Sequence, residues 1–264
     1  MTPYEMGKIS AFLLVHRRIE ERSQRRPIHK EERDFAEILR DAGVDEMRLL
    51  EEMMTGYGFE LVMLTAFDVK GISPGARAYM LVRLTNAVCP LLETSKVIDA
   101  MGTGSTRNSV AKIWFTQIWL LHLDLIYSAR GRGPQERNEW LESNFTKEQL
   151  LEAVRSHING FVRKLNPEFA STSEVYSVLS AEKGSELPRY VQRFLNLMVD
   201  AGMLEEIAQH SYRQSLLAAV EMKTNYDRVL APLMVDLGPQ MPVFGQIAQP
   251  LLTTSTDNPN ERKE

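Results

Sequence analysis

Four polar side chains between residues 185 and 202 are of the types that read nucleic-acid bases. Arginine, glutamine and asparagine make paired hydrogen bonds with the edges of guanine and adenine in the major groove. An apolar stripe at helical spacing runs along the same segment, formed by Val191, Phe194, Leu195 and Met198, and it predicts an amphipathic helix. We expect the opposite side of this helix to contact bases or phosphates through Arg189, Gln192, Arg193 and Asn196.

The segments around this helix follow one another in a recognisable order. A short amphipathic run at 173–179 ends before Gly184, and the helix itself opens with Ser185 and Pro188 and stops at Gly202. Two β-like runs follow, at 203–207 and 211–215. Helix, helix and a two-stranded ribbon is the layout of a winged helix, and this block resembles that superfamily. The resemblance implies binding to nucleic acid or to another protein rather than catalysis, with Arg213 in the ribbon as a phosphate contact.

The charge of this block leaves two functions open. Residues 185–215 contain three arginines against four acidic residues, which are Glu186, Asp200, Glu205 and Glu206. Phosphate neutralisation supplies much of the affinity for DNA, so a DNA-reading module is normally clearly basic. A near-neutral winged helix suits pairing with another protein at least as well.

Two further groups of arginines have the chemistry to neutralise phosphates. One group surrounds the end of the first predicted helix and includes Arg25 and Arg26, although two glutamates interrupt it. The other lies in a glycine-rich loop and includes Arg130 and Arg132. Helix ends and loops carry arginines routinely, so a plain solvated surface is the alternative interpretation for both groups.

Residue patterns for catalysis or metal binding are weak. The five histidines show no short-range spacing typical of metal ligands. The loop at 102–107 is rich in glycine, serine and threonine, but it lacks the Gly-Lys-Ser/Thr ending of a nucleotide-binding loop. We therefore expect a protein that is not an enzyme and uses neither a metal nor a cofactor.

Composition restricts the partners and the compartment. The 264 residues carry a net charge of −4, which gives no whole-protein field to attract DNA or an anionic membrane. The single cysteine, Cys89, cannot form an internal disulfide and fits a reducing compartment. The N-terminus lacks the features of a signal peptide, and the most apolar stretch, 113–127, is too short and too polar to span a membrane. We expect a cytoplasmic protein whose partner is DNA, another protein or a second copy, and no membrane.

Helical patterns dominate the chain and predict a mainly α fold in three parts. These are a helical body at 1–166, the winged helix with its small hairpin at 167–232, and an extended or disordered tail at 233–264. The longest apolar helix, at about 106–128, should be the centre of the core, with Trp114 and Trp119 largely buried. Ser73-Pro74 predicts another helix start, the run at 59–67 fits a strand or a helix, and no internal repeat is visible.

The predicted function is a non-enzymatic winged-helix subunit or regulator acting in a DNA transaction. Transcription control, chromosome or plasmid maintenance and defence against foreign DNA are settings that need such a subunit. The alternative is a protein-interaction scaffold, or a dimeric accessory subunit of a larger complex, without direct DNA contact. DNA binding predicts that Arg189 and Arg193 share an exposed face with one of the other two arginine groups, whereas the scaffold alternative does not need such a face.

Overall fold

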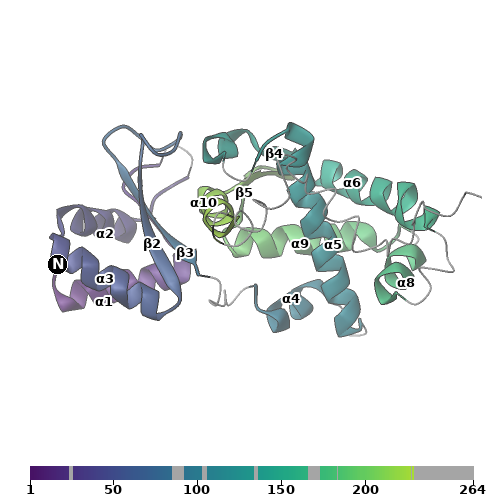
Figure 1. Ribbon diagram of the computed structural model, residues 1–264, viewed down its shortest axis with the longest axis horizontal. Coiled ribbons are helices and arrows are strands. Elements are labelled where there is room, and N and C mark those ends of the chain that lie inside the picture. The colour runs from purple at the N-terminus through teal and green to yellow at the C-terminus, as the bar shows by residue number, and fades with distance from the viewer. Residues whose placement is uncertain are drawn as a thin grey trace, which may run out of the picture.

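The computed structural model describes residues 1–23, 26–84, 92–102, 106–133, 136–165, 173–182, 184–226 and 228. Within these ranges the chain is mainly α-helical and carries two small antiparallel sheets of three strands each. The elements form two units, one within residues 1–84 and one within residues 92–228, which lie side by side in Figure 1. None of the helices in the described ranges combines the length and apolar character that crossing a membrane requires.

The first unit is a small sheet covered on one face by three helices. Its elements are α1 (Pro3–His16), β1 (Arg18–Glu20), α2 (Lys30–Asp41), α3 (Val44–Gly56), β2 (Phe59–Thr65) and β3 (Arg77–Arg83). Thr2 and Glu5 form a capping box that starts α1, and Pro3 occupies its first turn. The strand order is β1-β3-β2, so β3 lies in the middle, with Tyr79 opposite both Ile19 and Met63.

The second unit contains most of the remaining helices. Its elements are α4 (Thr94–Met101), α5 (Asn108–Ile126), β4 (Asn144–Thr146), α6 (Lys147–Gly160), α8 (Glu174–Ala181), α9 (Leu187–Asp200), β5 (Leu204–Ala208), β6 (Ser211–Gln214) and α10 (Leu216–Asn225), with short 3-10 helices η2 (Ser128–Arg130), η3 (Arg137–Glu142) and η4 (Val162–Lys164). Thr146 and Gln149 form the capping box that their spacing predicts, and it starts α6. The strand order is β4-β6-β5.

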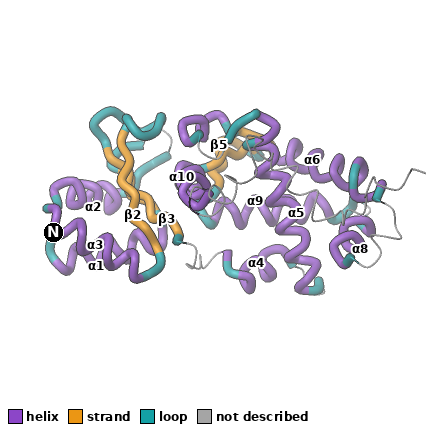
Figure 2. The backbone as a smooth tube through the Cα atoms, viewed as in Figure 1, coloured by secondary structure: helices purple, strands orange, loops and turns teal. Residues whose placement is uncertain are grey.

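The two units repeat one topology that the sequence does not reveal. Each runs helix, strand, helix, helix, strand, strand, and in each the last strand lies in the middle of its sheet. The second unit adds α4 before the repeat, α8 between α6 and α9, and α10 at its end. Figure 2 shows the two sheets as separate orange patches, each beside its own helices. The strand β4 comes from residues 144–146, which precede the boundary that we expected near residue 166.

The helix expected to start at Ser73-Pro74 is wrong, and a strand takes its place. The amide of Ala76 donates to the carbonyl of Ser73 at 3.0 Å, and Gly75 has a φ of +75°, so the segment is a turn that leads into β3. The ambiguous run at 59–67 is the strand β2. Strand β3 is buried on both faces, because Tyr79 packs in the core of the first unit and Met80 in the core of the second. Such a strand shows no alternation of apolar and polar residues.

The long apolar helix occurs close to where its composition places it. Helix α5 lies in the larger core, and Trp114 is only 2% exposed. Trp119 packs at the edge of this core and lines a pocket of about 380 Å³ next to α10, so most of its surface is covered, although less than that of Trp114. The predicted tail at 233–264 lies outside the described residues, as do Cys89 and Arg25.

Two clusters of charged residues and one loop are among the contacts that join the units, and Arg228 also pairs with Glu60. The carboxylate of Glu221 on α10 accepts hydrogen bonds from Arg17 at 3.1 Å and from Arg83 in the first unit. Glu205 on β5 pairs with Arg18 at 3.0 Å and with Arg213 on β6 at 2.7 Å. These contacts, together with the shared strand β3, hold the two units in one arrangement.

The loop between β2 and β3 makes the third joint. The indole N–H of Trp140 on η3 donates to the carbonyl of Lys70 at 3.0 Å, and the amide of Lys70 donates to Asn138 at 2.9 Å. Gly71 has a φ of +99°, and a Cβ atom at this position would lie 3.1 Å from the Trp140 ring. The positive φ therefore favours glycine, and the close approach of the indole leaves little room for a Cβ atom.

Candidate functional site

Helix α9 is amphipathic as its sequence predicts, and it is covered on two sides. The apolar stripe of Val191, Phe194, Leu195 and Met198 is buried in the core. On a second side, the ring of Tyr190 stacks on Trp114 with ring centroids 4.9 Å apart. Beside it, Arg193 donates to the carbonyl of Met101 at 3.0 Å, at the C-terminal end of α4. This bond satisfies a carbonyl that the end of α4 leaves without a helical partner.

The remaining side of α9 carries three of the four residues chosen for base contacts. Arg189 is 67% exposed and pairs with Glu186 at 3.2 Å. The amide of Gln192 donates to the side-chain oxygen of Asn196 at 2.8 Å. Exposed pairs of this kind on one helix are weak, so a ligand could displace them. Arg189, Gln192 and Asn196 thus share one open face, whereas Arg193 is turned towards α4.

Arg213 lies in the joint between the units rather than on an outer surface. Its side chain is 12% exposed, pairs with Glu205 at 2.7 Å and lies 5.4 Å above the ring of Trp140. Glu205 also pairs with Arg18 of the first unit. The residue expected to contact phosphate is therefore engaged by a carboxylate and an aromatic ring of its own chain.

Arg130 and Arg132 both stabilise the loop that contains them. Arg130 donates to the carbonyl of Glu142 at 2.6 Å and to that of Asn144, where β4 begins. Arg132 is buried, donates to the side-chain oxygen of Gln214 at 3.0 Å and lies 4.6 Å above the ring of Tyr127. These two arginines hold the segment before β4 against the sheet of the second unit.

Arg26 is likewise held by carboxylates of its own unit. It pairs with Glu20 at 3.0 Å and with Glu32, which is only 1% exposed. Burial alone would lower the pKa of Arg26, but the hydrogen bond to Glu32 and the charges of both glutamates raise that pKa above its ordinary value. Arg26 is therefore a fixed cation that links the segment before α2 to the helix.

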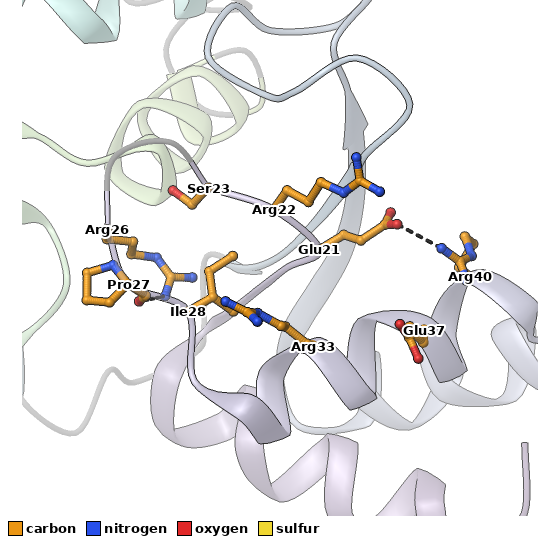
Figure 3. Close-up of a pocket in the computed structure, with 9 residues that line it drawn as sticks. All are labelled: Glu21, Arg22, Ser23, Arg26, Pro27, Ile28, Arg33, Glu37 and Arg40. Carbon is orange, nitrogen blue, oxygen red and sulfur yellow. Dashed lines mark hydrogen bonds and ion pairs between the residues drawn. The ribbon is translucent and has the colours of Figure 1, made fainter.

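A pocket of about 520 Å³ next to α2 is lined by Arg22 and Arg26, which belong to the N-terminal arginine group, and by Arg33 and Arg40, which sequence reasoning did not include in it. Figure 3 shows the pocket between the side chains of residues 21–23 and 26–28 and those of Arg33, Glu37 and Arg40 on α2. Arg40 pairs with Glu21 at 2.8 Å. Within the described part of the chain, Arg22 and Arg33 are exposed and make no ion pair. Residues 33, 37 and 40 are spaced so that they share one face of a helix. This spacing in the sequence could have placed Arg33 and Arg40 with the N-terminal arginine group.

Helix α3 occupies in the first unit the position that α9 occupies in the second, directly before the two-strand hairpin. It contains four acidic residues, Asp45, Glu46, Glu51 and Glu52, and one basic residue, Arg48. Val44 is 87% exposed and Leu49 is 54% exposed. Exposed apolar side chains continue into the hairpin with Tyr57, Met63 and Phe67. Sequence reasoning passed over this helix because its apolar residues look like ordinary helical periodicity.

Metal-binding side chains are not clustered in the described ranges. No cluster of three or more histidine, cysteine, aspartate or glutamate side chains there could hold a metal ion. His122 is buried, and desolvation lowers its pKa to about 4, so its ring is neutral near pH 7.

Comparison with known proteins adds no relative: no family model, no curated protein and no solved structure matches this chain.

Proposed function

We propose that this chain is a non-enzymatic accessory subunit built from two winged helices, and that it works by binding another protein within a larger complex. The observation that carries the proposal is the contrast between the two helices that precede the hairpins. The arginines expected to contact DNA around α9 are mostly engaged inside the molecule. The equivalent helix α3 exposes apolar side chains among acidic ones.

The repeated topology supports two winged helices rather than one. Helix, helix and two-stranded ribbon follow one another as α8, α9, β5 and β6 and as α2, α3, β2 and β3, although the counterpart of α2 in the repeated topology is α6 and α8 is an addition. In both units a short earlier strand, β1 or β4, pairs with the second strand of the ribbon. The resemblance that we drew for the C-terminal block therefore extends to the first unit as part of the proposal.

The chemistry of α3 favours a protein partner over nucleic acid. Its four acidic residues and one basic residue would repel phosphates, which carry the affinity for nucleic acid. Exposed Val44 and Leu49 offer apolar area of the kind that forms the centre of protein interfaces. The partner segment that fits this helix is apolar with basic residues around it.

Direct DNA contact is a second candidate, and two observations favour it. Arg22 and Arg33 are exposed at the pocket beside α2, and the described residues provide them with no ion pair. The open face of α9 adds Arg189, Gln192 and Asn196. In that case the chain would still serve a DNA transaction, with backbone contacts from the first unit.

The experiment compares two double-lysine variants in affinity capture from the source organism, with a mass measurement of the purified chain. In the first variant, Leu49→Lys and Glu52→Lys change the exposed side of α3. The matched control, Glu174→Lys and Val175→Lys, changes an exposed acid and an exposed apolar residue on α8. We expect a stoichiometric partner, or a second copy, to be lost with the α3 variant and retained with the control.

A binding titration against random-sequence duplex at two salt concentrations separates the second candidate. Two results together would overturn the protein-binding proposal. The first is salt-sensitive DNA binding that weakens in the double variant Arg22→Ala with Arg33→Ala. The second is an α3 variant that leaves both the captured partner and DNA binding unchanged. Arg189→Ala with Gln192→Ala tests the α9 face in the same assay, and each lost phosphate contact should lower the salt dependence by about one unit of slope.

A further inference from the structure

Strand β2 is a long, regular edge strand whose outer side has no partner strand in the described ranges. It spans seven residues, Phe59–Thr65, and each of them pairs with β3 in continuous register. The order of the sheet is β1-β3-β2, so β3 covers only one side of β2. The open side of an edge strand is a template for pairing with another chain.

The hydrogen bonds of the sheet identify which backbone groups lie at this edge. The amide of Leu84 donates to the carbonyl of Gly58 at 2.9 Å, so these two residues form a bonded pair between the ends of β3 and β2. Bonded and non-bonded pairs alternate along an antiparallel ladder, so β2 bonds to β3 through its even-numbered residues. The N–H and C=O groups of Phe59, Leu61 and Met63 therefore point outward, away from β3.

Strand β2 lacks the features that protect the other sheet edges from pairing. Short length, a bulge, a proline or several charged side chains blunt an edge strand. Strands β1 and β4 are three residues long, and β5 contains Glu205, Glu206 and a register shift between Glu206 and Ala208. The only charged residue of β2 is Glu60, and its carboxylate pairs with Arg228. The edge of β2 is therefore open to a further strand.

We propose that a second copy of this chain occupies this edge, with the two β2 strands paired antiparallel about a twofold axis at Leu61. In this register Phe59 bonds with the partner's Met63, Leu61 with the partner's Leu61, and Met63 with the partner's Phe59. Each bonded pair exchanges two hydrogen bonds, so the seam contains about six of them. All three outward residues of each strand are then satisfied, and the two sheets become one.

The charge of Glu60 selects this register over the preceding one. An axis at Glu60 would place the two Glu60 carboxylates directly opposite each other, and like charges in that position are destabilising. It would also leave Met63 opposite a residue that lies outside the partner's strand. The axis at Leu61 instead places Glu60 opposite the partner's Val62, which is uncharged.

The turn after β2 excludes the register that follows. The amide of Thr65 donates to the carboxylate of Asp68 at 2.8 Å, and its carbonyl accepts from the amides of Asp68 and Val69. An axis at Val62 would require Thr65 to bond with the partner's Phe59. Both backbone groups of Thr65 are already engaged, so this register forms fewer bonds than the one centred on Leu61.

Exposed apolar side chains beside the edge fit the same register. Met63 is 49% exposed, and the axis at Leu61 places it opposite the partner's Phe59, where its thioether can contact the ring. Tyr57 precedes the strand and is 56% exposed, and it falls opposite the partner's Thr65. The seam uses the backbone of β2 and not the outer side of α3, so it does not depend on the proposed function.

The first test is the mass of the full chain in solution, measured by light scattering over a range of protein concentrations. We expect wild type to have twice the mass of one chain, which is 30.1 kDa. Met63→Pro removes an outward N–H group that β3 does not use, and it should return the mass to that of one chain. The matched control Met63→Ala loses the same side chain but keeps the N–H group, so it should remain a dimer. Circular dichroism shows whether both variants are folded.

The second test examines the register and is independent of Met63→Pro. Glu60→Cys and Val62→Cys are prepared as separate proteins, each with Cys89→Ser, and are then mixed and oxidised. Residues opposite each other in a non-bonded pair have Cα atoms about 4.5 Å apart, which a disulfide can bridge. We expect a covalent dimer in the mixture and little with either variant alone, because identical residues are offset along the seam.

Several outcomes would overturn the proposal. These are a wild-type monomer at every concentration, a folded Met63→Pro variant that stays a dimer, and equal cross-linking in the mixture and in the single variants. Loss of the dimer in Leu49→Lys with Glu52→Lys would place the self-contact on α3 instead. A monomer that dimerises once residues 229–264 are removed would assign the edge to that segment of the chain. A dimer retained in the α3 variant, whether or not the captured partner is lost, supports the seam independently of the proposed function.

Discussion

The carboxylate of Glu221 is the most consequential single charge that joins the two units. It is 4% exposed and accepts hydrogen bonds from Arg83 and from Arg17, which is itself 5% exposed. The change Glu221→Gln keeps the shape of the side chain but removes its charge. Two guanidinium groups then face each other across a neutral amide, and one of them is buried.

The expected loss of stability follows from that geometry. Removing one partner of a buried ion pair costs about 3–5 kcal/mol, because the other charge stays buried without compensation. Arg17 keeps a hydrogen bond to the Leu81 carbonyl at 2.9 Å and lies 5.7 Å from the ring of Phe59, while Arg83 can turn towards solvent. We therefore expect a loss near the lower end, about 3 kcal/mol in the free energy of unfolding.

Urea unfolding followed by circular dichroism measures this loss. The matched control is Glu52→Gln, which removes a glutamate whose ion pair with Arg48 is exposed on both sides, and it should change the midpoint little. Arg17→Met combined with Glu221→Leu should recover much of the stability, since apolar replacements need no counter-charge. A loss below about 1 kcal/mol for Glu221→Gln, the range of exposed pairs, would refute the reasoning.

Three further predictions concern the core and the joints. The ordinary pKa of histidine is 6.5 and that of His122 is about 4, so the unfolded chain takes up the proton first as the pH falls. The free energy of unfolding should therefore fall by about 3 kcal/mol between pH 7 and pH 4. His122→Phe, compared with wild type by urea unfolding at both pH values, should lack that part of the loss. Gly71→Val should destabilise the chain by about 1–3 kcal/mol because its φ of +99° disfavours a branched residue and the Cβ meets Trp140, and an unchanged thermal midpoint would contradict the close contact. Trp114→Ala should lower the free energy of unfolding by about 3–5 kcal/mol, and Trp119→Ala should lower it less, because Trp119 already borders a cavity. Equal losses for the two variants in denaturant unfolding would disprove this.

The sequence predicted helices that have a clear apolar pattern and missed the strand that has none. Helix α5 lacks a polar face, so its burial was evident from composition alone. Strand β3 has apolar residues on both faces, and Ser73-Pro74 before it imitates a helix start. Recognising this segment as a strand required knowing that α10 covers the second face of β3, and no local sequence pattern contains that information.

The sequence predicted which helix face carries each arginine, but it did not predict whether that arginine is free to bind a ligand. The open side of α9 with Arg189, Gln192 and Asn196 follows directly from the apolar stripe. Whether an arginine is available depends on partners that are distant in sequence. Arg213 meets Glu205 on the neighbouring strand, which in turn meets Arg18 from the other unit. Such pairings arise from tertiary structure, so residue type and spacing cannot reveal them.

The burial of β3 on both faces has a consequence for synthesis on the ribosome. Ala78, Met80 and Val82 belong to the core of the second unit, and α10 packs against this strand. Helix α10 begins at Leu216, 133 residues after β3 ends at Arg83. At a translation rate of about 5–20 residues per second, the nascent first unit waits about 7–27 s with an apolar sheet face in water. During that interval the face is a substrate for chaperones and for pairing with neighbouring nascent chains on the same messenger RNA.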